Sequence, residues 1–377
     1  MALLRGECVL RHKKSRLDVT LLSIATAVPP HVMGQREAIK AVETVFADQF
    51  GDFDRIAAIF ASAGIAERHI TRPLDWYFGG HGWPERTAAY LDGALALFVE
   101  AAGKALDRAG IAADAVDSVV TVSSTGIATP SLEARALASL GFRRDVQRVP
   151  VFGLGCAGGV AGLALGADLA MARPGSVVLV VAVELCSLAV RRDQATKANM
   201  VALALFGDGA AAAVLTSGRV GEGGRAARIM DSGHYTWPGT LDIMGWKVDP
   251  VGFGVIFDQS IPAFAREHLG ASLDAILSAQ GLARSDIDRF VCHPGGRKVV
   301  EAFEGALGLR PGSLDYEREV LRRYGNMSAP TVLFVLERAL ESGLPERAML
   351  IALGPGFTVS TATLAGVSAG SQARRLE

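Results

Sequence analysis

The sequence repeats itself at a shift of 171 residues, and this internal duplication restricts the possible folds more than any other feature. Residues 110–121 (GIAADAVDSVVT) align without a gap with residues 281–292 (GLARSDIDRFVC), which lie 171 positions later. At nearly the same shift, 170 positions, Cys156 aligns with Asn326. Repeated units fold alike and pack against each other. We therefore expect two similar halves related by a pseudo-two-fold axis, with corresponding loops meeting at one site.

Apolar strands alternate with helical segments in both halves. Strands that are apolar throughout indicate sheets covered by helices, and hence a layered α/β fold. The helix that follows Cys156 consists largely of Gly and Ala, so it can lie between two sheets. The predicted fold is a five-layer αβαβα sandwich made of two duplicated halves. Its predicted parts are a polar N-terminal arm (1–18), an N-terminal half with the cysteine (19–220) and a C-terminal half with His293 and Asn326 (221–377).

The apolar periodicity also predicts individual elements. Ser131 is expected to cap the helix LEARALASL, and GRVGEGGR (218–225) is the best candidate for a linker. Helices are predicted over about 35–66, 87–109, 261–280, 296–306 and 327–342, and strands over 117–124, 146–152, 177–183, 288–293 and 347–353.

Charge and cysteine content exclude several classes of protein. The net charge is −1 and the basic residues form no dense run beyond residues 11–14, which argues against nucleic-acid binding. The four cysteines have neither CxxC nor metal-ligand spacing, so we expect free thiols in a reducing cytoplasm and no metal site. No secretory segment and no run of about 18 uncharged apolar residues is present, so no membrane span is predicted.

Three residues point to thioester chemistry. Cys156 lies in the turn GLGCAGG, between a short strand and a helix, where free N–H groups and the helix dipole are expected to lower a thiol pKa. His293 ends a strand before Pro-Gly-Gly, and Asn326 begins a helix. Alone, each has an ordinary alternative: a buried structural cysteine, a structural histidine and an N-cap asparagine. Together they suit a nucleophile that accepts an acyl group and two donors that stabilise an enolate oxygen.

A competing interpretation is a dinucleotide site. Gly153, Gly155 and Gly158 satisfy the GxGxxG fingerprint between a strand and a helix, and Glu184 ends the next strand. However, the motif lies in the middle of the chain, and the acid follows 26 residues after the last glycine instead of about 20. A cysteine also occupies the turn. The nucleotide-cofactor hypothesis is therefore the weaker one.

The motifs resemble those of the thiolase superfamily and, within it, the type III polyketide synthases, which include chalcone synthase and the bacterial alkylresorcinol and alkylpyrone synthases. The resemblance extends over nearly all of the chain after residue 20. It rests on GLGCAGG, LFGDGAAAA from Leu205, CHPGG around His293, YGNMSAPT around Asn326 and GPGFT from Gly354. Ketoacyl-carrier-protein synthase III enzymes share the Cys, His and Asn set and remain the alternative. They usually carry His-Gln-Ala-Asn where this chain has His-Pro-Gly-Gly.

The resemblance implies roles for the three residues. Cys156 would accept the acyl group, and His293 would keep it ionised. His293 and Asn326 would also promote decarboxylation of malonyl-CoA and hold the resulting enolate. Phe206 would be the aromatic residue at the mouth of the cavity. The family further implies a homodimer that uses acyl-CoA and malonyl-CoA as substrates and needs no metal or redox cofactor.

The substrate pocket implied by the resemblance differs from that of the plant enzymes. Ser124 and Thr125 match a hydroxyl pair near the pocket and are candidates for guiding cyclisation, and Val255 falls near a second gatekeeper position. Cys186 and Ala189 replace threonines. Because these side chains are smaller or less polar, we expect a fatty acyl-CoA starter and an alkylpyrone or alkylresorcinol product.

The basic residues that bind CoA phosphates in the family are fewer here. Arg55 is retained as a candidate CoA contact, whereas Ala58 and Ser62 stand where Arg and Lys are expected.

Overall fold

Two sheets with matching strand order form the frame of the molecule. The computed structural model describes residues 18–46, 53–217 and 227–366. Its principal strands are β1 (Val19–Ala27), β4 (Ser118–Val122), β5 (Gln147–Val151), β6 (Val177–Leu185), β7 (Asp208–Thr216), β8 (Ala227–Thr236), β11 (Arg289–Cys292), β12 (Ala348–Gly354) and β13 (Thr358–Gly366). The N-terminal half has the order β5-β4-β6-β7-β1, and the C-terminal half has β11-β12-β13-β8. A short β1–β8 pairing joins them into nine strands.

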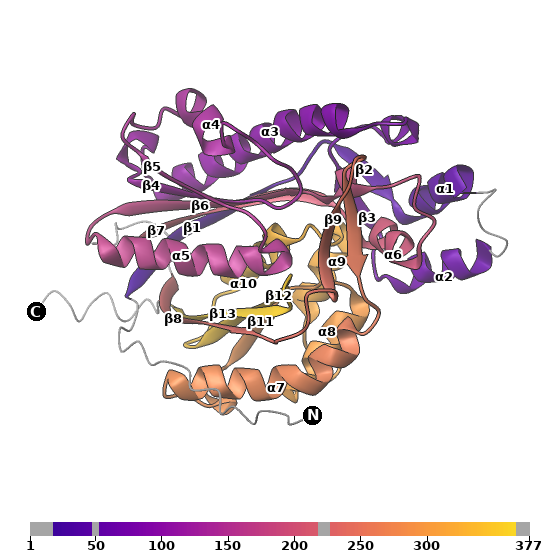
Figure 1. Ribbon diagram of the computed structural model, residues 1–377. Helices are drawn as coiled ribbons and strands as arrows, with labels where there is room; N and C mark the ends of the chain where they lie inside the picture. The colour runs from indigo at the N-terminus through magenta and orange to yellow at the C-terminus, as the bar shows by residue number, and fades with distance from the viewer. Residues whose placement is uncertain (1–17, 47–52, 218–226, 367–377) are drawn as a thin grey trace, which may run out of the picture.

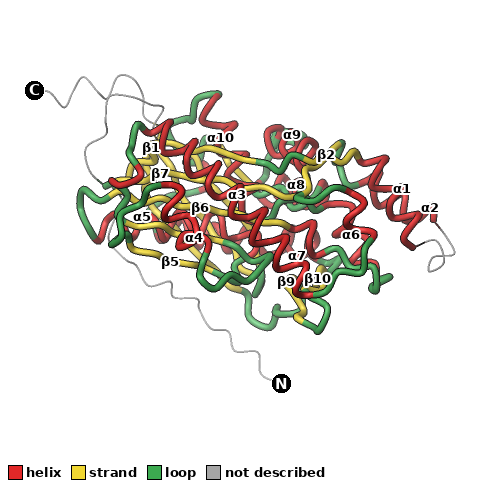
Figure 2. Tube along the Cα trace, turned by 90° about the horizontal axis from the view of Figure 1, so that it is seen from above, coloured by secondary structure: helices red, strands yellow, loops and turns green. Residues whose placement is uncertain are grey.

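Helices complete a five-layer sandwich, as predicted (Figure 1). Helices α5 (Gly158–Ala172) and α10 (Ala329–Glu341) lie between the two sheets. Helices α3 (Trp83–Ala109) and α4 (Leu132–Leu140) cover one outer face, where Figure 2 shows α3 crossing the strands. Helices α7 (Ile261–Ala279) and α8 (Arg297–Leu307) cover the other.

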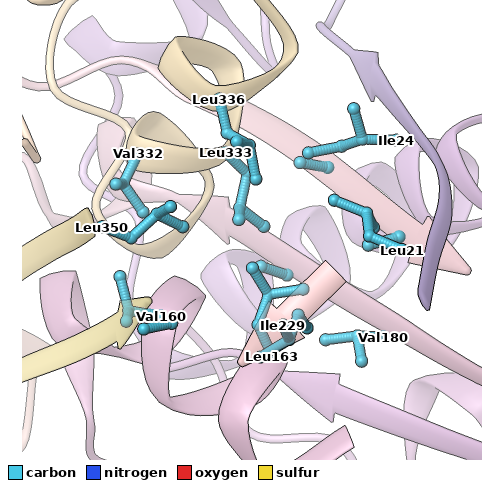
Figure 3. Close-up of a cluster of buried hydrophobic side chains, with 14 of the residues drawn as sticks. Leu21, Ile24, Val160, Leu163, Val180, Ile229, Val332, Leu333, Leu336 and Leu350 are labelled. Atoms are coloured by element: carbon cyan, nitrogen blue, oxygen red, sulfur yellow. The ribbon is translucent and has the colours of Figure 1, made fainter. Parts of the chain in front are cut away.

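Small residues allow the central helices to approach each other and the sheets. A Cβ atom added at Gly159 of α5 would lie only 2.2 Å from the carbonyl oxygen of Ala329 in α10, and one at Gly162 would lie 2.8 Å from Val122. Larger apolar side chains from both helices and both sheets fill the remaining space, and Leu163, Leu333 and Leu350 are completely buried there (Figure 3). Because burial of one such side chain contributes about 1.5–3 kcal/mol, this layer is a major source of stability.

The duplication seen in the sequence is present in the structure. Strands β4 and β11, helices α5 and α10, and strands β6 and β12 each begin 171 residues apart. The correspondence is interrupted after β6, where the N-terminal half inserts the 3-10 turn η4 (Cys186–Ala189) and helix α6 (Lys197–Leu205) before β7. This insertion between β6 and β7 brings Phe206 to the site described below. Strand β5 has no counterpart among the described residues of the other half, and it forms one edge of the nine-stranded sheet.

Several elements differ from the prediction. The helix predicted over 35–66 is two helices, α1 (Gln35–Phe46) and α2 (Phe53–Ser62). Ser131 occupies the N-cap of α4, but its hydroxyl bonds Glu133 instead of capping the backbone. Residues 1–17 of the predicted arm, the linker 218–225 and the boundary at residue 220 lie outside the described residues. Sequence periodicity missed β1, α6, β2 (His31–Gly34), β3 (Glu67–Ile70), β9 (Met244–Val248), β10 (Phe253–Phe257) and α9 (Asp315–Tyr324).

Candidate active site

Cys156 lies in a tight turn at the entrance to α5. It is the middle residue of the 3-10 turn η3 (Gly155–Ala157), and only 8% of its surface is exposed. The turn needs glycine at Gly155, where φ is +47° and an added Cβ would lie 2.6 Å from Pro355. The Ser124 hydroxyl accepts hydrogen bonds from the backbone N–H groups of Gly153 and Gly155, each at 3.2 Å. These contacts fix the position of the thiol.

Asn326 reaches the cysteine from the C-terminal half. Its backbone forms a short bridge with the insertion, because its N–H donates to Leu205 O at 2.8 Å and its carbonyl accepts from Gly207 N at 3.0 Å. Its side-chain Nδ2 donates to Gly295 O at 3.1 Å, and its side chain also hydrogen-bonds the Cys156 thiol. The structure therefore brings Asn326 and Cys156 close together, and their catalytic roles stay predictions.

Ser328 is a further site residue that the sequence reasoning did not identify. Its backbone lies at φ +58°, a conformation that costs a non-glycine residue about 1–3 kcal/mol. In this conformation its N–H donates to Asn326 Oδ1 at 2.8 Å, and its side chain hydrogen-bonds the Cys156 thiol. Its position two residues after Asn326, inside the motif YGNMSAPT, was the available signal.

His293 follows the end of β11 and is almost completely buried. Its backbone N–H donates to Ile351 O at 2.8 Å, and the N–H of the preceding Cys292 donates to the buried carboxyl group of Glu317 at 2.8 Å. The His293 ring lies next to Gly295, whose carbonyl accepts the bond from Asn326. Among the described residues neither ring nitrogen has a hydrogen-bond partner, so both are available to a ligand.

The protonation states differ from those expected from the sequence. Burial raises the pKa of Cys156 to about 11, and the hydrogen bonds from Ser328 and Asn326 offset this only in part. Burial also lowers the pKa of His293 to about 3. The shift of the Cys156 pKa runs opposite to the predicted one, because removal of the thiol and the imidazole from water disfavours their charged forms. The role of His293 in keeping Cys156 ionised stays a prediction.

A small chamber opens over Cys156. Three of the predicted pocket residues line it: Phe206, Cys186 and Val255. The sequence reasoning missed the hairpin β9–β10, which forms one wall, and it therefore missed Trp246. The full lining is Gly155, Cys156, Cys186, Phe206, Met244, Gly245, Trp246, Val255, Ile256, Phe257, Ser328 and Pro355.

The other predicted pocket residues lie behind this wall. Ser124 supports the nucleophile turn, and Ala189 is buried at the end of η4. The Thr125 hydroxyl donates to Glu184 at 2.7 Å and accepts from Leu185 N at 2.8 Å. None of the three lines the chamber. A role for Ser124 and Thr125 in cyclisation stays a prediction.

Glu184 has a different role from the one that the dinucleotide fingerprint suggested. It is fully buried, and it accepts hydrogen bonds from Thr125 and from the backbone N–H of Ser124. Burial raises its pKa to about 7, and its negative charge raises the pKa of Cys156. The glycine at Gly158 packs against Val122 and Ala329 instead of leaving room for a pyrophosphate. Local packing therefore accounts for the GxGxxG pattern.

A larger groove adjoins the chamber. Phe257 lines both, and Gly295 places the groove beside His293. Its rim carries the cationic side chains of Lys197, Arg297 and Lys298. The side chain of the predicted CoA contact Arg55, in α2, lies outside the described residues.

The described residues contain no cluster of His, Cys, Asp and Glu suited to a metal ion. One described stretch, Gly155–Ala172, is long and apolar enough to cross a membrane, but 67% of it is buried in the central layer of the protein.

Comparison with known proteins places this site in a family. The N-terminal domain of chalcone and stilbene synthases matches residues 84–219, and their C-terminal domain matches residues 231–368. The chain is 40% identical over 352 residues to 1,3,6,8-tetrahydroxynaphthalene synthase of Streptomyces peucetius subsp. caesius, covering 92% of this chain and 93% of that protein. It is 37% identical to a putative chalcone synthase of Bacillus subtilis, over 90% and 96% of the two chains.

A solved structure agrees with this assignment. The crystal structure of 1,3,6,8-tetrahydroxynaphthalene synthase from Streptomyces coelicolor, a bacterial type III polyketide synthase, superposes with a TM-score of 0.86 at 29% identity and covers 93% of this chain and all of that one. With the thiol, imidazole and carboxamide described above, these matches show that the chain belongs to the chalcone and stilbene synthase family, the type III polyketide synthases, which are acyltransferases that act by decarboxylative condensation of malonyl-CoA.

Proposed function

We propose that the chain transfers a fatty acyl group from CoA to Cys156, extends it with malonyl-CoA and cyclises the product to an alkylpyrone or alkylresorcinol. The observation that carries this proposal is the apolar chamber over Cys156, whose wall has Cys186 and Val255 where larger or more polar residues would exclude an alkyl chain. The chamber offers few polar groups to a phenolic starter. The cycle uses CoA thioesters as its substrates and transfers no electrons, so it requires no redox cofactor.

Loading begins from the neutral pair. The Cys156 sulfur attacks the thioester carbonyl while its proton passes to His293, whose ring nitrogens are free to accept it. The bond from the carbonyl carbon to the CoA sulfur then breaks, and the imidazolium returns the proton to the departing thiolate. A positioned acid–base group of this kind contributes about 10²–10⁴ in rate.

Extension uses His293 and Asn326 as donors. When malonyl-CoA loses its carboxylate as CO₂, the electron pair forms an enolate whose oxygen is stabilised by hydrogen bonds from Asn326 Nδ2 and the imidazole. The enolate carbon then attacks the acyl group on Cys156. A carbon–carbon bond forms, the carbon–sulfur bond breaks, and the thiolate of Cys156 is released for the next transfer.

The cationic rim supports a route for CoA. Lys197, Arg297 and Lys298 stand on the groove that adjoins the chamber, where they would meet the phosphates of CoA. They would replace the basic residues missing at Ala58 and Ser62. Arg55 stays a prediction.

The free edge of the sheet supports a homodimer. Strand β5 is an edge strand whose residues are only partly buried, and the exposed apolar side chains of Phe152 and Ile127 lie beside it. Exposed apolar side chains beside an uncovered strand favour contact with a second copy. A cytoplasmic location stays a prediction.

The relatives suggest a second candidate starter. Three of them are named for 1,3,6,8-tetrahydroxynaphthalene and three for 3,5-dihydroxyphenylacetyl-CoA. Trp246 and Phe257 narrow the chamber, which favours a short starter such as malonyl-CoA.

The test is intact-protein mass spectrometry after incubation with dodecanoyl-CoA, hexanoyl-CoA or malonyl-CoA, with Cys156→Ala as the control. A dodecanoyl adduct on Cys156, followed by pyrone or resorcinol formation when malonyl-CoA is added, is the expected result. Product formation from malonyl-CoA alone, without acylation by either fatty acyl-CoA, would contradict the fatty acyl starter and indicate that malonyl-CoA is the starter. The ketoacyl-synthase alternative requires that extension stop after one malonyl unit.

A further inference from the structure

The hairpin β9–β10 forms one wall of the Cys156 chamber but belongs to neither large sheet. Among the described residues its two strands pair only with each other. Trp246 and Val255 lie directly opposite each other in this pairing, and both line the chamber. A two-stranded hairpin is at best marginally stable by itself in water. Contacts from outside the hairpin must therefore keep these two side chains over Cys156.

An ion pair connects the hairpin to the insertion between β6 and β7. Arg191 lies in that insertion, between η4 and α6, and only 2% of its side chain is exposed. Its Nη1 donates to both carboxylate oxygens of Asp249, at 2.9 and 3.0 Å. Its Nε and Nη2 donate to Asp193, at 2.7 and 2.5 Å. Asp249 directly follows β9, so the buried guanidinium group holds the hairpin at its turn.

Asp249 also organises the turn itself and contacts a third segment. Its Oδ1 accepts hydrogen bonds from the backbone N–H groups of Val251 and Gly252, at 2.9 and 3.2 Å. Its backbone carbonyl accepts from Nε1 of Trp83, the first residue of α3, at 2.8 Å. The Trp83 ring meets Phe253 of β10 edge-on, with the ring centroids 5.1 Å apart. Helix α3, the insertion and the hairpin turn therefore meet at one aspartate.

We propose that the ion pair between Arg191 and Asp249 positions the hairpin wall and thereby limits the number of malonyl units that are added. Arg191 is a positioning residue, because it does not line the chamber. Its effect reaches the chamber through the hairpin, where the Phe253 ring near the turn lies 5.9 Å from the Trp246 ring. The inference rests on the proposed function and adds a determinant of product length to it. A chain that outgrows the chamber loses its alignment for the next condensation, so a displaced wall permits a longer chain.

The first test removes the ion pair and keeps the turn. In Asp249→Asn the amide oxygen can still accept from the two turn N–H groups, whereas the second oxygen and the negative charge that faces Arg191 are lost. Loss of a hydrogen bond to a charged group should raise the population of the open hairpin about 10- to 100-fold. Hydrogen exchange in peptides covering residues 244–257, measured by mass spectrometry, should accelerate by the same factor.

Two further variants and a control belong to this measurement. Arg191→Gln should accelerate exchange in the hairpin as Asp249→Asn does, whereas Arg191→Lys keeps a positive charge and should have a smaller effect. The matched control is Arg284→Gln, which breaks a bidentate ion pair with Asp274 on the outer face of the C-terminal half. It should leave exchange in the hairpin unchanged.

The second test measures product length. Each variant is incubated with malonyl-CoA and either hexanoyl-CoA or dodecanoyl-CoA, and the products are analysed by liquid chromatography and mass spectrometry. If chains with one additional malonyl unit form only when the wall is open, their yield relative to the wild-type product should rise about 10- to 100-fold in Asp249→Asn and Arg191→Gln. A variant that is only less stable makes less of every product in the wild-type ratio. The double variant should shift the ratio no further than the stronger single variant, because both changes remove one pair.

Two results would overturn the role of the ion pair. One is exchange in the hairpin of Asp249→Asn at the wild-type rate, and the other is a wild-type product ratio in a variant whose hairpin exchanges faster. If the wild type makes no product from either fatty acyl-CoA, the proposed function fails instead. The product ratio is then compared with malonyl-CoA as the only substrate, and the same two results decide.

Discussion

Replacing Ser328 separates two effects of one residue. Ser328 holds a strained backbone at φ +58° and hydrogen-bonds the Cys156 thiol. Ser328→Ala keeps the strain and removes the hydroxyl, whereas Ser328→Gly removes both. Elsewhere glycine is less stable than alanine by about 0.5–1 kcal/mol. Relief of about 1–3 kcal/mol of strain should reverse this order, so the glycine variant should be the more stable by up to about 2.5 kcal/mol.

The same variants should change the reactivity of the thiol. A lost hydrogen bond of about 0.5–1.5 kcal/mol corresponds to a rise of about 0.5–1 in the pKa of Cys156. Below the thiol pKa of about 11, this slows alkylation by about three- to tenfold at any given pH.

The assay compares urea unfolding of the two variants and follows iodoacetamide labelling of Cys156 by peptide mass spectrometry between pH 7 and 10. A glycine variant that is less stable than the alanine variant would refute the strain argument. Unchanged labelling rates in both variants would refute the hydrogen bond.

Four further substitutions test the site and the packing around it. His293→Gln removes the proton acceptor and should slow CoA release on loading by about 10²–10⁴; an unchanged burst would exclude His293 as the base. Asn326→Asp removes the Nδ2 donor and should slow CO₂ release from malonyl-CoA by about 10²–10³, whereas loading of Cys156 should suffer less. Because the folded pKa of Glu184 is raised to about 7, the contribution of this carboxyl group to stability is lost as pH rises from about 4.5 to 7. The melting temperature of Glu184→Gln relative to wild type should therefore rise between pH 5 and 8. A difference that does not change with pH would contradict the raised pKa of Glu184. Gly159→Ala places a Cβ 2.2 Å from a carbonyl oxygen of α10 and should destabilise the protein by about 1–3 kcal/mol in urea unfolding. The control is Gly103→Ala, whose added Cβ meets nothing within 4 Å, and it should be neutral or stabilising in the same measurement.

The five-layer fold was predictable because the duplication carried most of the information. The shift of 171 residues reappears in the starts of β4 and β11 and of α5 and α10. Small residues in the segment after Cys156 correctly indicated a helix between two sheets. The same alignment brought Cys156 and Asn326 together without any knowledge of the structure.

Two parts of the site were beyond the sequence reasoning. The hairpin that carries Trp246 is only partly buried, and Lys247 interrupts the apolar run of its first strand, β9. The protonation state of Cys156 depends on how deeply the thiol is buried, and a local motif reports the helix terminus but not the burial. The sequence therefore predicted a lowered thiol pKa at a position where burial raises it.

The bridge between Phe206 and Asn326 has a consequence for protein engineering. Its two hydrogen bonds use only main-chain atoms, so they do not depend on which side chains the insertion between β6 and β7 carries. Residues of the insertion that face the chamber can be exchanged while the carboxamide of Asn326 stays in place. Starter selectivity and carbon–carbon bond formation are thus separable design variables in this scaffold.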